Sequence, residues 1–234
     1  MLLKELIRQL VFGELSTLAL VEDNDLGELQ GGYEAIMPHI NLALSSVHKR
    51  LHLREESVTL RQSASINKYF LSTKYAVSNT GSAASKYLID SAGDPFLGNS
   101  LKIIGIELDG VKIPLNDRSI DNPILLPTPN SIRIVKPVEG QEVVVTFRAD
   151  HPNVDVLTFD PDTEELDIPD FVLEPMLYFI ASRVHASYPS ISEGMDDSYK
   201  YRQKYEAAMK EISDHGLVDT SSNSNNKLEI NGWA

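Results

Sequence analysis

Residues 36–61, IMPHINLALSSVHKRLHLREESVTLR, contain the change of pattern that decides the fold. In the first half, apolar side chains recur every three or four positions, which places them on one face of a helix. This apolar row consists of Ile36, Ile40, Ala43, Leu44, Val47 and Leu51, and Asn41, Ser45, His48 and Lys49 fall largely outside it. After Glu56 the apolar spacing changes to two, which is typical of strands. A long helix is therefore followed directly by a β region.

Helical spacing is also found near both ends of the chain. Apolar residues between Leu2 and Val11 predict a first helix that ends near Gly13. From Asp167 a third helix is expected, with Pro169 in its first turn and a kink at Pro175. Its apolar row is Leu173, Leu177, Ile180 and Val184, with Met176 and Phe179 on its flanks. A last helix is expected to start near Asp196-Asp197 and to end at Gly216, and its apolar row is Tyr201, Tyr205, Ala208, Met209 and Ile212.

The middle of the chain is expected to form a meander of short antiparallel strands. Candidate strands are Val58–Arg61, Tyr69–Lys74, Tyr87–Asp90, Lys102–Leu108, Ile132–Lys136 and Glu142–Arg148. Asp109-Gly110 is the sharpest turn signal, because this dipeptide readily adopts the positive φ angles of a two-residue hairpin. Pro114, Pro123, Pro127 and Pro129 indicate a long loop.

The sequence thus predicts an α+β fold in which helices from both ends of the chain form a bundle around an inserted antiparallel β domain. The expected parts are the N-terminal helices (residues 1–56), the β-rich insertion (57–168), the C-terminal helices (169–216) and a tail (217–234). The tail begins with the polar stretch Ser221–Asn226, which is typical of a flexible linker.

Composition excludes several classes of function. The 234 residues include 21 Lys and Arg against 34 Asp and Glu, which gives a net charge of −13, and there is no dense basic stripe for nucleic acid or anionic membrane. The absence of cysteine excludes disulfides and thiolate metal sites. No apolar run is long enough to span a membrane, and charges interrupt the apolar N-terminus, so we expect a soluble protein made in the cytoplasm.

No strong signal for catalysis or cofactor binding is found. Phosphate-binding loops, a dinucleotide-binding glycine set, a nucleophile elbow and a zinc-protease helix are all missing from the sequence. His48 and His52, with Glu55, could share a metal, but two solvated histidines on a helix are the favoured interpretation. The acidic residues between Asp155 and Asp167 could hold calcium, but they lack the spacing of an EF-hand and are better explained as a solvated linker. We expect no metal, no cofactor and no enzymatic activity.

A resemblance to a known family is carried by the order of the expected elements, which is two N-terminal helices, a β-rich insertion, two further helices and a tail. It is also carried by three stretches within Leu166–Ile212. They are Ile168–Phe171, which leads into a helix ending with Tyr178–Val184, and Ser198–Glu206 on the next helix. A proline-led helix with aromatic and alanine residues, followed by a charged helix with tyrosines, resembles the head-to-tail adaptor (connector) proteins of tailed bacteriophages. The nearest type is the tail tubular protein A of short-tailed phages. The β insertion is larger than in compact adaptors.

The resemblance implies a structural virion protein at the head–tail interface, made in the host cytoplasm. It implies a homo-oligomeric ring, typically a dodecamer, that binds the portal protein on one side and the tail tube or nozzle protein on the other. DNA would pass through this ring without specific binding, because an acidic wall adds no phosphate affinity.

Two sets of residues are expected to make contacts in such a ring. Tyr199, Tyr201 and Tyr205 are candidates for the subunit interface. Tyrosines on helices more often pack against neighbouring helices, and stacking on bases is the less favoured alternative. The tail is a candidate docking peptide for the portal through Leu228, Ile230 and Trp233, with a disordered terminus as the alternative.

Two other functions remain open from the sequence. One is a carbohydrate- or host-binding virion module built on the β insertion. The other is a cell-wall hydrolase with a carboxylate pair such as Glu164 and Asp167.

Overall fold

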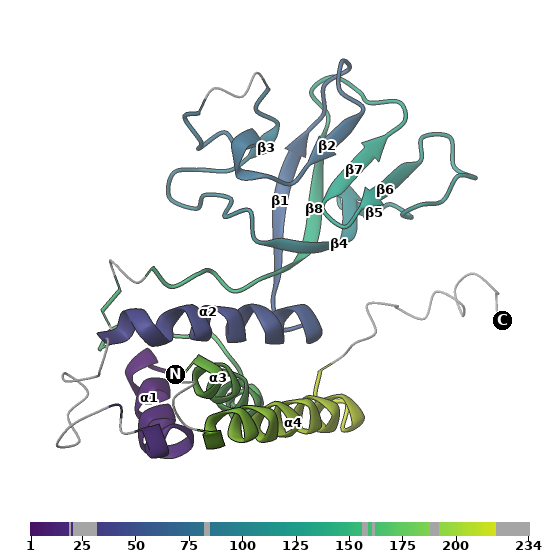
Figure 1. Ribbon diagram of the computed structural model, residues 1–234. Coiled ribbons are helices and arrows are strands. Elements are labelled where there is room, and N and C mark those ends of the chain that lie inside the picture. The colour runs from purple at the N-terminus through teal and green to yellow at the C-terminus, as the bar shows by residue number, and fades with distance from the viewer. Residues whose placement is uncertain are drawn as a thin grey trace. The chain divides into compact units, whose positions relative to one another are not determined.

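The chain folds into two structural units, one helical and one made of β-strands (Figure 1). The computed structural model describes residues 1–18, 20, 32–81, 85–155, 159–160, 162–187 and 192–218. The helical unit comprises Met1–Leu53 and Asn153–Ala234, and the β unit comprises Arg54–Pro152. The expectation of a mixed α+β protein is confirmed. No helix in the described part of the chain has the length and apolarity needed to cross a membrane.

Four α-helices form the described part of the helical unit: α1 (Leu3–Gln9), α2 (Gly32–Arg50), α3 (Leu173–Ser187) and α4 (Ser192–Asp214). A π-helix, Leu10–Glu14, continues α1, and a 3₁₀ helix, Asp170–Val172, precedes α3. α3 packs against both α2 and α4 (Figure 1). The N-terminus is held by the segment before α3, because Leu2 pairs with Glu165 in an antiparallel bridge.

The apolar rows of these helices meet in one core. Ile40, Leu44 and Val47 of α2 are at most 1% exposed. The row of α3 is shifted from the expected one, because Met176 and Ile180 are buried while Leu177 is only partly buried. The histidine at position 48 was expected in solvent, but it is 1% exposed, and its Nδ1 lies 2.8 Å from the Leu44 carbonyl oxygen.

The described residues of the β unit form two antiparallel sheets. The larger sheet has the strand order β3-β1-β8-β4-β5 and the smaller has the order β2-β7-β6. The strands are β1 (Glu55–Arg61), β2 (Lys68–Phe70), β3 (Leu88–Ile89), β4 (Ser100–Leu108), β5 (Val111–Lys112), β6 (Ile124–Thr128), β7 (Ser131–Ile134) and β8 (Glu142–Ala149). Both sheets contribute to one core, in which Tyr69 and Ile132 of the smaller sheet join Leu60 and Val145 of the larger. Because strand side chains alternate, the opposite faces remain outside this core.

The sharpest turn predicted from the sequence is confirmed. Asp109 and Gly110 have φ angles of 51° and 78°, and they join Leu108 to its partner Val111 in the β4–β5 hairpin. Positive φ at both central positions is what a two-residue hairpin requires.

Three local expectations are corrected by the structure. The proline-rich segment is not a continuous loop, because it contains β6, where Pro127 lies on an edge strand that can dispense with one N–H donor. Pro175 lies in the first turn of α3, which needs no N–H donor there, so it is not expected to kink the helix. α4 begins at Ser192, before Asp196-Asp197.

Candidate interaction surfaces

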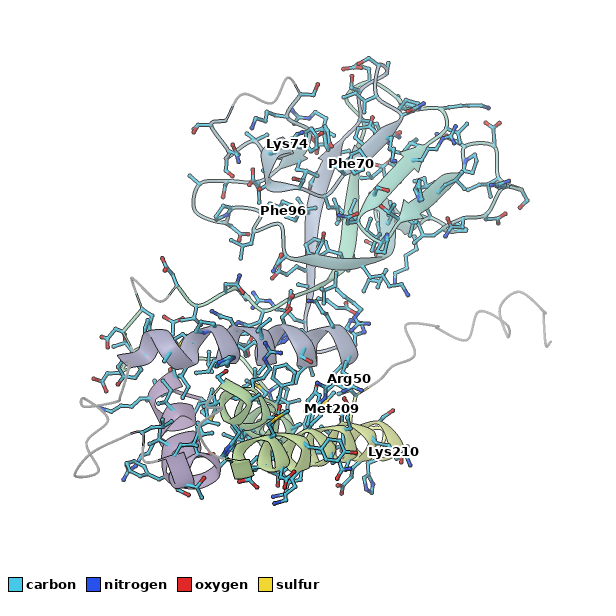
Figure 2. All side chains as sticks on the ribbon, viewed as in Figure 1. Arg50, Phe70, Lys74, Phe96, Met209 and Lys210 are labelled. Carbon is cyan, nitrogen blue, oxygen red and sulfur yellow. The ribbon has the colours of Figure 1, made fainter. Side chains whose placement is uncertain are left out.

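Tyr205 belongs to the core of the helical unit. It is 1% exposed, its ring meets Phe179 of α3 edge-on at 5.2 Å between centroids, and its hydroxyl is hydrogen-bonded to Ser46 Oγ at 2.7 Å. Arg50 lies at the end of α2 (Figure 2). Its guanidinium lies over the same ring, 5.3 Å from the centroid, and pairs with the Glu206 carboxylate at 2.6 Å. Tyr205 therefore joins α4 to α2 and α3, and we do not retain it as a subunit-interface residue.

Tyr201 is partly buried and also serves packing within the chain. Its ring stacks on His185 with 5.3 Å between centroids, and the Lys204 ammonium lies 5.0 Å from its centroid. Burial, followed by a hydrogen bond to the Glu14 carboxylate, raises the pKa of Tyr201 to about 12. Tyr201 thus links α4 to α3 and to the π-helix.

Tyr199 differs from the other two tyrosines because it lies at the surface. Its side chain is 65% exposed, and Met195, one helical turn earlier on α4, is 78% exposed. Residues four positions apart lie on the same face of a helix, so the two side chains form one apolar strip. Tyr199 remains the candidate for a subunit interface, and Met195, which no sequence pattern indicated, extends the same exposed strip.

The expected docking peptide lies outside the described residues. Leu228, Ile230 and Trp233 are all in the stretch 219–234, so their role stays a prediction.

Charge is divided unevenly between the two units. Residues 54–152 contain 11 Lys and Arg and 11 Asp and Glu, so the whole net charge of −13 belongs to the residues of the helical unit. Within the helical unit, the segment before α3 is strongly acidic. Asp162 is paired with Lys4 at 2.5 Å, whereas Glu165 and Asp167 are exposed and form no ion pair with any described residue.

The smaller sheet of the β unit presents two positive charges directly opposite each other. Lys68 of β2 is the register partner of Arg133 of β7, and both side chains are exposed. Phe70, labelled in Figure 2, lies two residues along β2 on the same face and is 36% exposed. The Lys68 ammonium lies over its ring, 4.8 Å from the centroid. No pattern in the sequence indicates this face, because Lys68 and Arg133 are brought together only by the pairing of two strands distant in sequence.

No protein-family model matches this sequence, and no curated protein matches it either. The interpretation of these surfaces therefore depends on their geometry and chemistry.

The described residues do not assemble a metal site from the candidates in the sequence. No three His, Asp or Glu side chains within the described ranges are grouped as metal ligands would be. Glu164 is partly buried and Asp167 is exposed in the segment before α3. The Glu164 backbone is engaged in pairing with the N-terminus, since its carbonyl accepts the Leu3 N–H at 2.9 Å.

Proposed function

We propose that this chain is a structural subunit of the head-to-tail connector of a tailed phage, which assembles as a ring between the portal and the tail tube or nozzle. The observation that carries the proposal is the division of the chain. One helical unit is built from residues on both sides of a complete β unit, as the resemblance to phage adaptors implies. A ring subunit must contact copies of itself and two further proteins, and two structural units provide separate surfaces for these contacts.

The exposed strip on α4 supports a subunit contact. Tyrosine and methionine are enriched in the cores of protein interfaces relative to the rest of the surface. Met195 and Tyr199 offer such a contact on a helix that is anchored further along by the buried side chains of Tyr205 and Met209. We therefore keep Tyr199, together with Met195, as the proposed contact between α4 and a neighbouring subunit.

The charge distribution suits a channel through which DNA moves. Each Lys or Arg that contacts a phosphate adds affinity by releasing counterions, so a wall that passes DNA freely should present few of them. The helical unit, which holds the net charge of −13, meets this requirement better than the neutral β unit. We assign the DNA-facing wall to the helical unit.

The experiment is to mix the purified chain with its cognate portal ring and to image the product by electron microscopy. Added density on one face of the portal, with the rotational symmetry of a ring, is expected. Met195→Glu with Tyr199→Glu should reduce the number of copies on each ring, because charge at an apolar contact is costly to bury. A matched control is Ala207→Glu, an exposed position of the same helix two turns beyond Tyr199 and outside the proposed strip.

A further inference from the structure

The pair Lys68 and Arg133 is electrostatically unusual for this protein. Side chains directly opposite on antiparallel strands have Cβ atoms about 5 Å apart, and like charges there are destabilising. Neither cation forms an ion pair with a carboxylate of any described residue. In the larger sheet, by contrast, Arg61 of β1 is the register partner of Glu142 of β8 and forms an ion pair with it at 2.7 Å. The Lys68–Arg133 pair therefore places two cations on one sheet face with no described carboxylate between them, and this face would attract an external anion.

Apolar groups flank the two cations. Phe70 follows Lys68 on the same face, and Leu125 of β6 is the register partner of Arg133 on its other side. We call this surface, made of Lys68, Phe70, Leu125 and Arg133, the cationic sheet face. Its composition suits a peptide segment that carries carboxylates beside apolar side chains better than it suits a bare inorganic anion.

The chain itself contains a segment that presents two exposed carboxylates beside the partly exposed Ile168. Glu165 pairs with Leu2 in an antiparallel bridge, and the sequence from 165 to 167 alternates between exposed and buried as Glu165, Leu166 and Asp167. Around such a bridge, residues two apart point to the same side of the chain. The two carboxylates are thus presented on one side of the segment, as the two cations are presented on one face of the sheet.

We propose that the cationic sheet face of one copy binds the exposed carboxylates of Glu165 and Asp167 in a second copy. The two surfaces differ, so the contact is head-to-tail, and such contacts form a closed ring when the rotation between copies closes. This inference rests on the proposed ring and assigns one of its subunit contacts. Charge complementarity sets the register of such an interface and makes it sensitive to salt.

The test uses two charge-reversed forms of the full chain. Form A carries Lys68→Glu and Arg133→Glu, and form B carries Glu165→Lys and Asp167→Lys. Each form alone brings like charges together, but in an equimolar mixture the acidic face of A meets the basic segment of B, and the basic face of B meets the acidic segment of A. Sedimentation velocity at low salt should show that the parent chain self-associates. The affinity of self-association should fall by at least about tenfold in A alone and in B alone, and it should recover in the mixture.

Controls separate this contact from general charge effects and from misfolding. Lys112→Glu with Arg118→Glu makes the same charge change on exposed positions of the β unit, and should leave association close to that of the parent. Lys68→Gln with Arg133→Gln removes the two positive charges without replacing them by negative ones. This variant should fold and still associate more weakly than the parent. Far-UV circular dichroism checks the fold of each form.

Three results would overturn the inference. They are a parent chain that remains monomeric at its highest soluble concentration, equal affinity of association in A, B and the parent, or a mixture of A and B that associates no more tightly than A alone. If a single-stranded oligonucleotide binds the parent chain but not form A, while self-association is unchanged, the face binds nucleic acid and the proposed contact is wrong. Portal binding is measured separately. If the chain attaches to the portal but charge reversal does not change self-association, only this contact is refuted. If charge reversal weakens self-association as expected but the chain does not attach to the portal, only the proposed function is refuted.

Discussion

Leu44→Ala should lower the free energy of unfolding of the helical unit by about 3 kcal/mol, within the range of about 2–5 kcal/mol for leucine-to-alanine changes in cores. Leu44 is 1% exposed in the middle of α2, where three carbon atoms would be lost from a packed environment. For a domain of this size, about 3 kcal/mol corresponds to a fall of roughly 12 °C in melting temperature.

Leu42→Ala is the matched control, because the same substitution is made in the same helix at a side chain that is 46% exposed. Its effect should stay within about 0.5 kcal/mol, as is usual at surface positions. Urea denaturation followed by far-UV circular dichroism, which is dominated by the helices, gives both values. If Leu44→Ala were no more destabilising than Leu42→Ala, the assignment of the buried face of α2 would be refuted.

Three further predictions concern the β unit and the tail. Burial of the Asp90 carboxylate opposes its ionisation, but hydrogen bonds from Ser78 and Phe96 outweigh burial and hold the pKa of Asp90 below the ordinary value. The ionised carboxylate therefore stabilises the β unit at neutral pH, and this contribution is lost as the pH falls through the lowered pKa. Asp90→Asn should therefore destabilise the β unit at pH 7, with a difference from the parent that narrows below about pH 4 in denaturation curves. Gly110→Ala should lower the free energy of unfolding of the β unit by about 1–2 kcal/mol, because Gly110 has a φ angle of 78° in the β4–β5 turn, which a residue with a Cβ atom rarely adopts. A thermal melt that matches the parent would contradict the assigned turn. Deleting Lys227–Ala234 should leave the melting temperature unchanged while weakening attachment to the portal, and undiminished attachment would remove the tail from the docking surface.

Local signals predicted much of the secondary structure. The Asp109-Gly110 turn and the apolar row of α2 depend on neighbouring residues, and both lie where the sequence placed them. β6 was missed because prolines argue against strands, and only the position of β6 at a sheet edge makes Pro127 tolerable there. His48 was misplaced because a polar residue beside an apolar row suggests exposure, whereas its ring nitrogen can be satisfied by the carbonyl of Leu44 one turn earlier.

The candidate surfaces were less predictable than the fold. All three tyrosines lie in one stretch of α4, and only the packing of α2 and α3 separates the core residue Tyr205 from the exposed Tyr199. The cationic sheet face depends on the register that places Lys68 opposite Arg133, and a single sequence does not specify which distant strands pair.

The most direct test of the connector proposal is the mass of the complex formed between this chain and its cognate portal ring, measured by native mass spectrometry or sedimentation. The account predicts a discrete complex that is heavier than the portal by about one ring of subunits, typically twelve. A portal ring whose mass is unchanged by an excess of the folded chain would contradict it.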